Sequence, residues 1–126
     1  KFPFASDTNA TDSADLTQNR TGAAGQSSFT FGYTAGGFAP GDGRVNTIDK
    51  FPFSSDVNSS DVGDITRTTN NTSGQSSTDN GYTSGGYVTG SGATNPIDKF
   101  PFASDANATD VGDLTVVTQT AAEQQV

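Results

Sequence analysis

Lys-Phe-Pro-Phe at residues 50–53 also opens the chain as residues 1–4 and returns as residues 99–102. Residues 1–49 align with residues 50–98 without insertion or deletion, and 24 of the 49 positions are identical. A fixed period of this length indicates a repeat architecture, in which each unit buries its surface against its neighbours. A feature that occurs in every copy is therefore expected to belong to the scaffold rather than to a single active site.

The repeat divides the chain into four parts. Residues 1–49 are the first unit, residues 50–98 are the second and residues 99–115 are a partial third. If the repeat is a four-stranded blade, the first unit begins in mid-repeat. Residues 116–126 depart from the repeat, so we expect them to form a C-terminal tail or a capping strand. Such a strand would matter because unpaired sheet edges attract other chains. We therefore expect the sheet edges to be covered, and the isolated chain not to be a stable monomer.

Each unit is predicted to contain about four short strands. Phe51 and Phe53 are two residues apart and would share one face of a strand, while Pro52 between them cannot donate to a neighbouring strand. Residues 62–66 predict a further strand, and residues 76–82 predict a hairpin because they contain an Asn-Gly pair. No segment shows helical periodicity, so the predicted fold class is all-β. Phe2, Phe51 and Phe100 are expected to be buried to a similar extent, unless the chain ends intrude.

The order of these features resembles the kelch repeat. Tyr33 precedes a double glycine at residues 36–37, a variable loop follows, and residues 48–53 supply an aromatic strand. Ile-Thr-Arg at residues 65–67 stands where a kelch unit has its closing strand and arginine. The resemblance implies four-stranded blades of about 49 residues. Two and a half blades are too few to close a ring, so the expected fold is part of a kelch-like β-propeller or an open β-repeat array.

The composition argues against several kinds of function. The chain has neither cysteine nor histidine, so it lacks thiolate ligands and the commonest general base. Six Lys and Arg stand against fourteen Asp and Glu, which argues against a nucleic-acid partner. No apolar run reaches the length of a membrane span, so membrane insertion is not expected. We therefore expect the protein not to be an enzyme.

Aspartate and asparagine recur at fixed positions after each Lys-Phe-Pro-Phe. One hypothesis is a calcium site, because hard cations bind several oxygens from one short loop. The alternative, which we favour, is that these side chains accept hydrogen bonds from loop backbone in turns and caps, with no cofactor bound. The candidate metal ligands are Asp7, Asn9, Asp12, Asp56, Asn58, Asp61, Asp105, Asn107 and Asp110.

Two loop aromatics are the candidate binding residues. Phe38 and Tyr87 follow the double glycines into the variable loop, where an aromatic ring can stack on a sugar or pack against a partner protein. Tyr33 and Tyr82 lie before the double glycines and are expected in the core instead.

Several short sequence motifs of the repeat resemble those of a second group of proteins. Its phrases include Gly-Gln-Ser-Ser at residues 25–28, Asn-Ala-Thr-Asp at residues 107–110 and Gly-Asp-Leu-Thr at residues 112–115. They are similar to repeats in predicted structural and tail-fibre proteins from phages of aquatic bacteria, especially cyanobacteria. The resemblance implies a non-enzymatic structural or adhesion module of an extracellular assembly, the virion, whose partners are host-surface glycan, other virion proteins or other copies of the chain.

Two other functions stay open. One is a self-assembling extracellular filament or surface-layer subunit, whose repeats are completed by neighbouring chains. The other, a glycan-processing enzyme built on paired aspartates, is weaker because the pair occurs in three copies.

Overall fold

The computed structural model of the chain describes residues 1–2, 5–120 and 124–125. The regular structure in these ranges consists of β-strands, and no helix there is long and apolar enough to cross a membrane. The prediction of an all-β fold is confirmed. The strands are β1 (Ala24–Ser27), β2 (Phe31–Ala35), β3 (Phe38–Ala39), β4 (Gly43–Arg44), β5 (Thr47–Pro52), β6 (Ser60–Asp64), β7 (Ser73–Ser76), β8 (Asn80–Ser84), β9 (Tyr87–Val88), β10 (Gly92–Pro101), β11 (Thr109–Thr118) and β12 (Gln124–Gln125).

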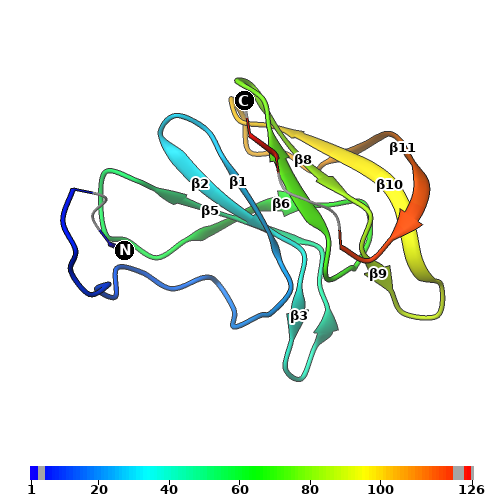
Figure 1. Ribbon diagram of the computed structural model, residues 1–126, viewed down its shortest axis with the longest axis horizontal. Coiled ribbons are helices and arrows are strands. Elements are labelled where there is room, and N and C mark those ends of the chain that lie inside the picture. Colours follow the sequence, from blue (N-terminus) through cyan, green and yellow to red (C-terminus); the bar gives the residue numbers. More distant parts are fainter. Residues whose placement is uncertain (3–4, 121–123, 126) are drawn as a thin grey trace.

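The strands form two main sheets that lie side by side (Figure 1). The first sheet has the order β1-β2-β5-β6, and the second has the order β11-β10-β8-β7-β12. β9 pairs with β10, while β3 and β4 form a separate hairpin. Neighbouring strands are antiparallel except β12, which is parallel to β7. The path of each sheet is open, so the described part of the chain contains no closed ring of strands.

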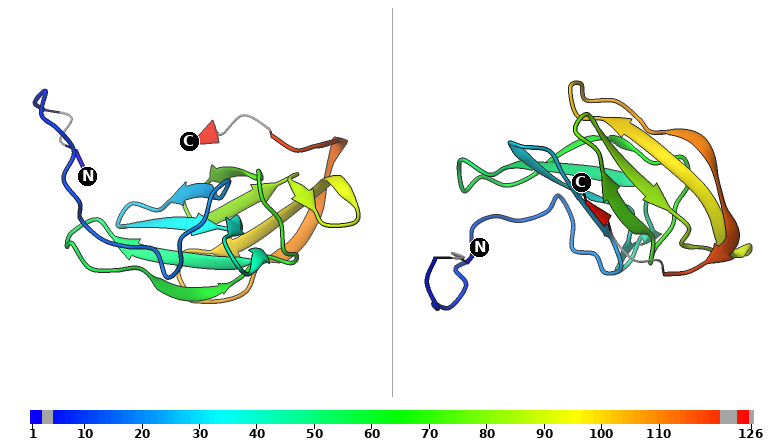
Figure 2. Two further views of the ribbon diagram at one scale, coloured as in Figure 1. Left: turned by 90° about the horizontal axis from the view of Figure 1, so that it is seen from below. Right: turned by 45° about the horizontal axis from the view of Figure 1, so that its top comes forward.

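Equivalent strands of the two sheets are 49 residues apart. β7 is the counterpart of β1, β8 of β2, β10 of β5 and β11 of β6. β12, in the C-terminal tail, keeps the same spacing, because Gln124 of β12 lies beside Gln75 of β7, which is 49 residues earlier in the chain. The segment before β1 and strand β11 lie at opposite ends of the molecule (Figures 1 and 2). Within the predicted tail, residues 121–123 and 126 lie outside the described residues.

Glycine allows close approach both within and between the sheets. Within each sheet, a Cβ at Gly32 would lie 2.3 Å from the ring of Phe51, and one at Gly81 would lie 2.3 Å from the ring of Phe100. These glycines therefore leave room for the phenylalanine of the adjacent strand to lie across the backbone. Between the sheets, a Cβ at Gly74 would lie 2.0 Å from the carbonyl oxygen of Gly25, so β1 and β7 could not approach so closely with a larger residue at position 74.

The small core lies where the two sheets meet. Tyr33 of the first sheet stacks on Phe102 of the second, with ring centroids 4.8 Å apart, and is 5.5 Å from the ring of Phe100. Equivalent phenylalanines are not equally buried. Phe2, which falls under the exception for chain ends, is 58% exposed, but Phe51 is also only half-buried while Phe100 is 2% exposed, so the prediction was wrong for that pair. Burial depends on whether a preceding unit supplies a ring that covers the position.

Candidate functional site

The polar residues of the repeat meet at the boundary between the sheets. Thr66, just after β6, donates a hydrogen bond from its hydroxyl to Asp98 Oδ1 at 2.7 Å, and its backbone N–H donates to Asp98 Oδ2 at 3.0 Å. Asp98 is 3% exposed, and Arg67 lies 3.7 Å from its carboxylate. A carboxylate of the second sheet thus accepts hydrogen bonds from the first. We call the contacts between the two sheets the central junction.

The segment before β1 makes the same contact with the first sheet. Thr17 donates from its hydroxyl to Asp49 Oδ1 at 2.7 Å and from its backbone N–H to Asp49 Oδ2 at 3.0 Å. Arg20 Nη2 lies 2.8 Å from Asp49 Oδ2, and both side chains are completely buried. Burial lowers the pKa of the Arg20 guanidinium, and the charge of Asp49 opposes this shift. We call the contacts of residues 1–2 and 5–20 with the first sheet the N-terminal junction.

The candidate asparagine ligands connect one unit to the next. Asn107 Oδ1 accepts a hydrogen bond from the backbone N–H of Asp64 at 3.0 Å, and the N–H of Ala108 donates to the Asp64 carbonyl at 2.8 Å. Asn58 accepts from the N–H of Asp15 in the same way, at 3.1 Å. These carboxamides therefore satisfy backbone donors of the preceding unit, which is the capping role that we favoured.

The candidate aspartates have two different roles. Asp105 Oδ1 pairs with Lys50 Nζ at 2.8 Å, and Asp56 Oδ1 pairs with Lys1 Nζ at 3.1 Å, each across a junction. Asp61 and Asp110 accept from the backbone N–H two residues later, at 3.1 Å in each case, as Asx turns do. Asp110 is also 3.2 Å from Arg67. The equivalents in the first copy, Asp7, Asn9 and Asp12, are exposed.

These contacts bear on the calcium hypothesis. The described residues contain no group of three or more Asp, Glu, His or Cys arranged to hold a metal ion. Asp105 and Asn107 are directed toward different partners, a lysine ammonium and a backbone N–H. Because these oxygens already have partners in the neighbouring unit, the donor set does not fit a calcium loop well. The calcium site stays a prediction.

Phe38 and Tyr87, the candidate binding aromatics, are brought together by Arg44. The Arg44 guanidinium carbon lies 4.5 Å from the ring centroid of Tyr87 and 6.0 Å from that of Phe38. Arg44 also donates to Asn70 Oδ1 at 2.7 Å and to Thr89 Oγ1 at 2.6 Å. Phe38 is 40% exposed. The group Phe38, Arg44 and Tyr87, which we call the loop edge, thus offers an accessible ring beside a cation.

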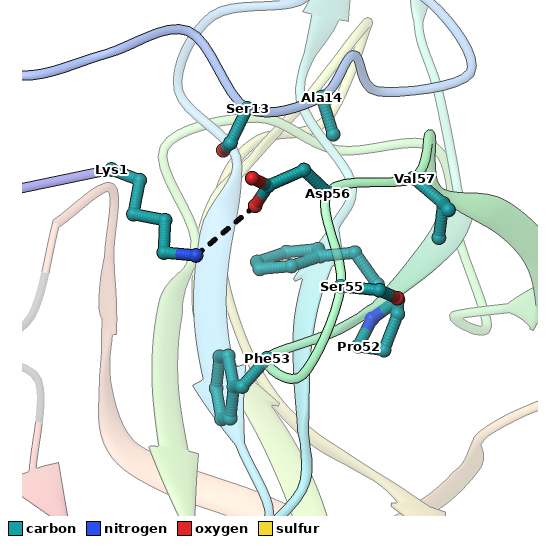
Figure 3. A pocket seen from close by; sticks show the side chains of 9 residues that line it. Lys1, Ser13, Ala14, Pro52, Phe53, Ser55, Asp56 and Val57 are labelled. Atoms are coloured by element: carbon teal, nitrogen blue, oxygen red, sulfur yellow. Dashed lines mark hydrogen bonds and ion pairs between the residues drawn. The ribbon is translucent and has the colours of Figure 1, made fainter.

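A cavity of about 380 Å³ opens at the N-terminal junction (Figure 3). Phe53 and the ion pair of Lys1 with Asp56 stand around it. Phe51 also lines the cavity and lies 6.0 Å from Phe53, ring to ring. The cavity is lined by Lys1, Ser13, Ala14, Phe51, Pro52, Phe53, Ser55, Asp56 and Val57.

The sequence analysis did not identify the buried aspartates Asp49 and Asp98 as functional residues. Each follows an isoleucine in a strand, the two are 49 residues apart, and a charged residue at such a place usually has a buried partner. The sequence therefore indicated that these aspartates are buried and paired. It did not identify their cationic partners, because Arg20 and Arg67 do not occupy equivalent positions of the repeat.

The chain was compared with protein-family models and with curated proteins. No family model matches it, and no curated protein matches it.

Proposed function

We propose that the chain is a non-enzymatic structural module of an extracellular assembly, a virion tail fibre, and that its loop edge contacts host-surface glycan. One observation carries the proposal: the polar residues that recur every 49 positions are used in contacts between units. Thr66 with Asp98 and Lys50 with Asp105 are examples at the central junction. Such contacts would stabilise a stack of units, which supports a structural role.

The adhesive part of the proposal rests on the loop edge. An exposed phenylalanine beside an arginine suits a sugar, because the ring stacks on its C–H face and the guanidinium donates to its hydroxyl groups. The virion assignment follows from the resemblance of the repeat phrases to those of phage tail-fibre proteins.

Binding to intact cyanobacterial cells and to their purified surface polysaccharide tests the proposal. We expect Phe38→Ala to weaken binding by about tenfold, which corresponds to about 1.4 kcal/mol. Phe29→Ala is the matched control, because Phe29 is 99% exposed and lies outside the loop edge. Equal weakening by both variants, or shortening of the polysaccharide by the chain, would contradict the proposal.

A self-assembling filament or surface-layer subunit is the second candidate. It is favoured by the cavity at the N-terminal junction, where the first sheet presents phenylalanines that no tyrosine of the described residues covers.

A further inference from the structure

The cavity at the N-terminal junction is the counterpart of a filled position at the central junction. Phe51, Phe53 and Asp56 line the cavity, and their equivalents 49 residues later are Phe100, Phe102 and Asp105. At the central junction, Tyr33 stacks on Phe102, while Lys50 pairs with Asp105. At the N-terminal junction, Lys1 pairs with Asp56 but the described residues supply no ring equivalent to that of Tyr33. The cavity therefore has the lining of a tyrosine-binding position.

The opposite end of the molecule presents the group that this cavity lacks. Tyr82 of β8 lies opposite Lys99 of β10, just as Tyr33 of β2 lies opposite Lys50 of β5. Tyr82 and Lys99 are half-buried, and neither side chain has a hydrogen bond or ion pair across a junction within the described residues. Thr115, the equivalent of Thr66, is exposed and likewise unpaired there.

We propose that a second copy of this chain docks head to tail, using the central junction as its template. Tyr82 of one copy enters the cavity of the next, Lys99 pairs with Asp56, and Thr115 donates to Asp49. The charges are complementary, since the Lys99 ammonium meets the Asp56 carboxylate, which forms an ion pair with Lys1 in the unbound chain. This inference rests on the proposed structural role and names the partner of that cavity.

Docking requires one segment of each copy to be displaced. Residues 1–17 are equivalent to residues 99–115, and those of them that the structure describes already occupy part of the position that the second sheet of the incoming copy takes. At the other end, β12 lies along β7 in the register that β1 of the next copy would adopt. Polar contacts are thus exchanged for equivalent ones, and the net gain is the burial of the Tyr82, Phe51 and Phe53 rings. The interface is heterologous, so it builds rings or filaments rather than closed dimers.

Glycine at position 25 gives a specific way to block this interface. A Cβ at Gly25 has nothing within 4 Å, whereas a Cβ at the equivalent Gly74 meets the carbonyl oxygen of Gly25 at the central junction. In the docked pair, Gly25 of the receiving copy faces Gly74 of the incoming copy. Gly25→Ala should therefore leave the fold of the chain intact and prevent docking.

Sedimentation velocity of the full chain over a range of concentrations tests the proposal. We expect the unaltered chain to form a concentration-dependent series that extends beyond the dimer. Gly25→Ala blocks the receiving end, which is the first sheet with its cavity, and Tyr82→Ser removes the ring of the offering end, which is the second sheet. Each variant alone should therefore be monomeric. An equimolar mixture should assemble and stop at the dimer, because only one intact junction can form. Lys99→Glu is a second variant of the offering end, and Phe29→Ser is the control that should assemble normally.

Thermal unfolding of each variant first establishes that it is folded. A monomeric unaltered chain at every concentration would overturn the proposal, as would normal assembly of Gly25→Ala or a mixture that stays monomeric. Failure of docking is distinguishable from failure of the proposed function. A monomer that binds cells through Phe38 would reject docking alone, whereas polysaccharide cleavage by a chain that assembles would reject the structural function alone.

Discussion

The two Phe-Pro-Phe turns have nearly the same geometry but very different surroundings. The rings of Phe51 and Phe53 are 6.0 Å apart at 78°, and those of Phe100 and Phe102 are 5.9 Å apart at 77°. Phe51, however, is only half-buried, while its equivalent Phe100 is 2% exposed beneath Tyr33. Phe53 is 50% exposed, while its equivalent Phe102 is half-buried and stacks on Tyr33. The local sequence therefore determines how the pair is arranged, and the preceding unit determines whether the pair is buried.

The polar contacts between threonine and aspartate, unlike the burial of the rings, are the same at the two junctions. The Thr17 hydroxyl is 2.7 Å from Asp49, and the Thr66 hydroxyl is 2.7 Å from Asp98. A short segment of chain is thus sufficient to make the polar part of a junction, without the tyrosine. We infer that the polar contacts fix the register between units and that the aromatic rings supply most of the apolar burial.

The largest expected difference between the turns is in the cost of removing a ring. Phe100→Ala should lower the free energy of unfolding by about 3–5 kcal/mol, because it leaves a cavity beneath Tyr33. Phe51→Ala, the equivalent change in the first turn, should cost about 1 kcal/mol, since that side chain is only half-buried and lines the cavity. Urea unfolding of the two variants measures both values. Equal losses would show that the N-terminal junction is closed in solution.

A smaller difference is expected at the glycines beneath the rings. Gly81→Ala forces its new methyl group against the Phe100 ring, which Tyr33 holds in place, and should cost about 1–3 kcal/mol. Gly32→Ala meets the Phe51 ring, which can move into the adjacent cavity, so its effect should be below about 1 kcal/mol.

Thermal unfolding of both glycine variants provides the measurement. If Gly32→Ala were the more damaging change, the Phe51 ring would have to be held more tightly than its exposure indicates, and the comparison between the turns would fail.

Much of the strand pattern could be predicted from the sequence. The predicted strand at residues 48–53 corresponds to β5 (Thr47–Pro52), and its proline stands at the strand end as expected. The hairpin was also predicted, but Asn80 and Gly81 belong to β8 and the turn precedes them. Gly81 is required there by the Phe100 ring rather than by the turn, and that contact between strands is not visible in a local pattern.

The site was harder to predict because its contacts join separate units. Asn107 and Asp105 suggested a shared cation, since they are two residues apart. Their partners, Asp64 and Lys50, lie 43 and 55 residues earlier in the preceding unit. Two side chains that are close in sequence thus serve different partners. The repeat period predicts that such contacts recur, but it does not specify which residues meet.

The smallest expected effect concerns pH and the ring that covers the buried turn. Burial raises the pKa of the Tyr33 hydroxyl above its usual value near 10, and the nearby charge of Lys50 opposes part of this shift. A raised pKa means that the folded chain retains the Tyr33 proton at a pH where the unfolded chain loses it. The contribution to stability is therefore complete below about pH 10 and is lost as the pH rises through the folded value. Tyr33→Phe keeps the ring and removes the titration, so urea unfolding from pH 8 upward should show a steeper alkaline loss in the unaltered chain. Parallel curves for the two proteins would mean that the Tyr33 hydroxyl reaches solvent and that the central junction is looser than its ring contacts indicate.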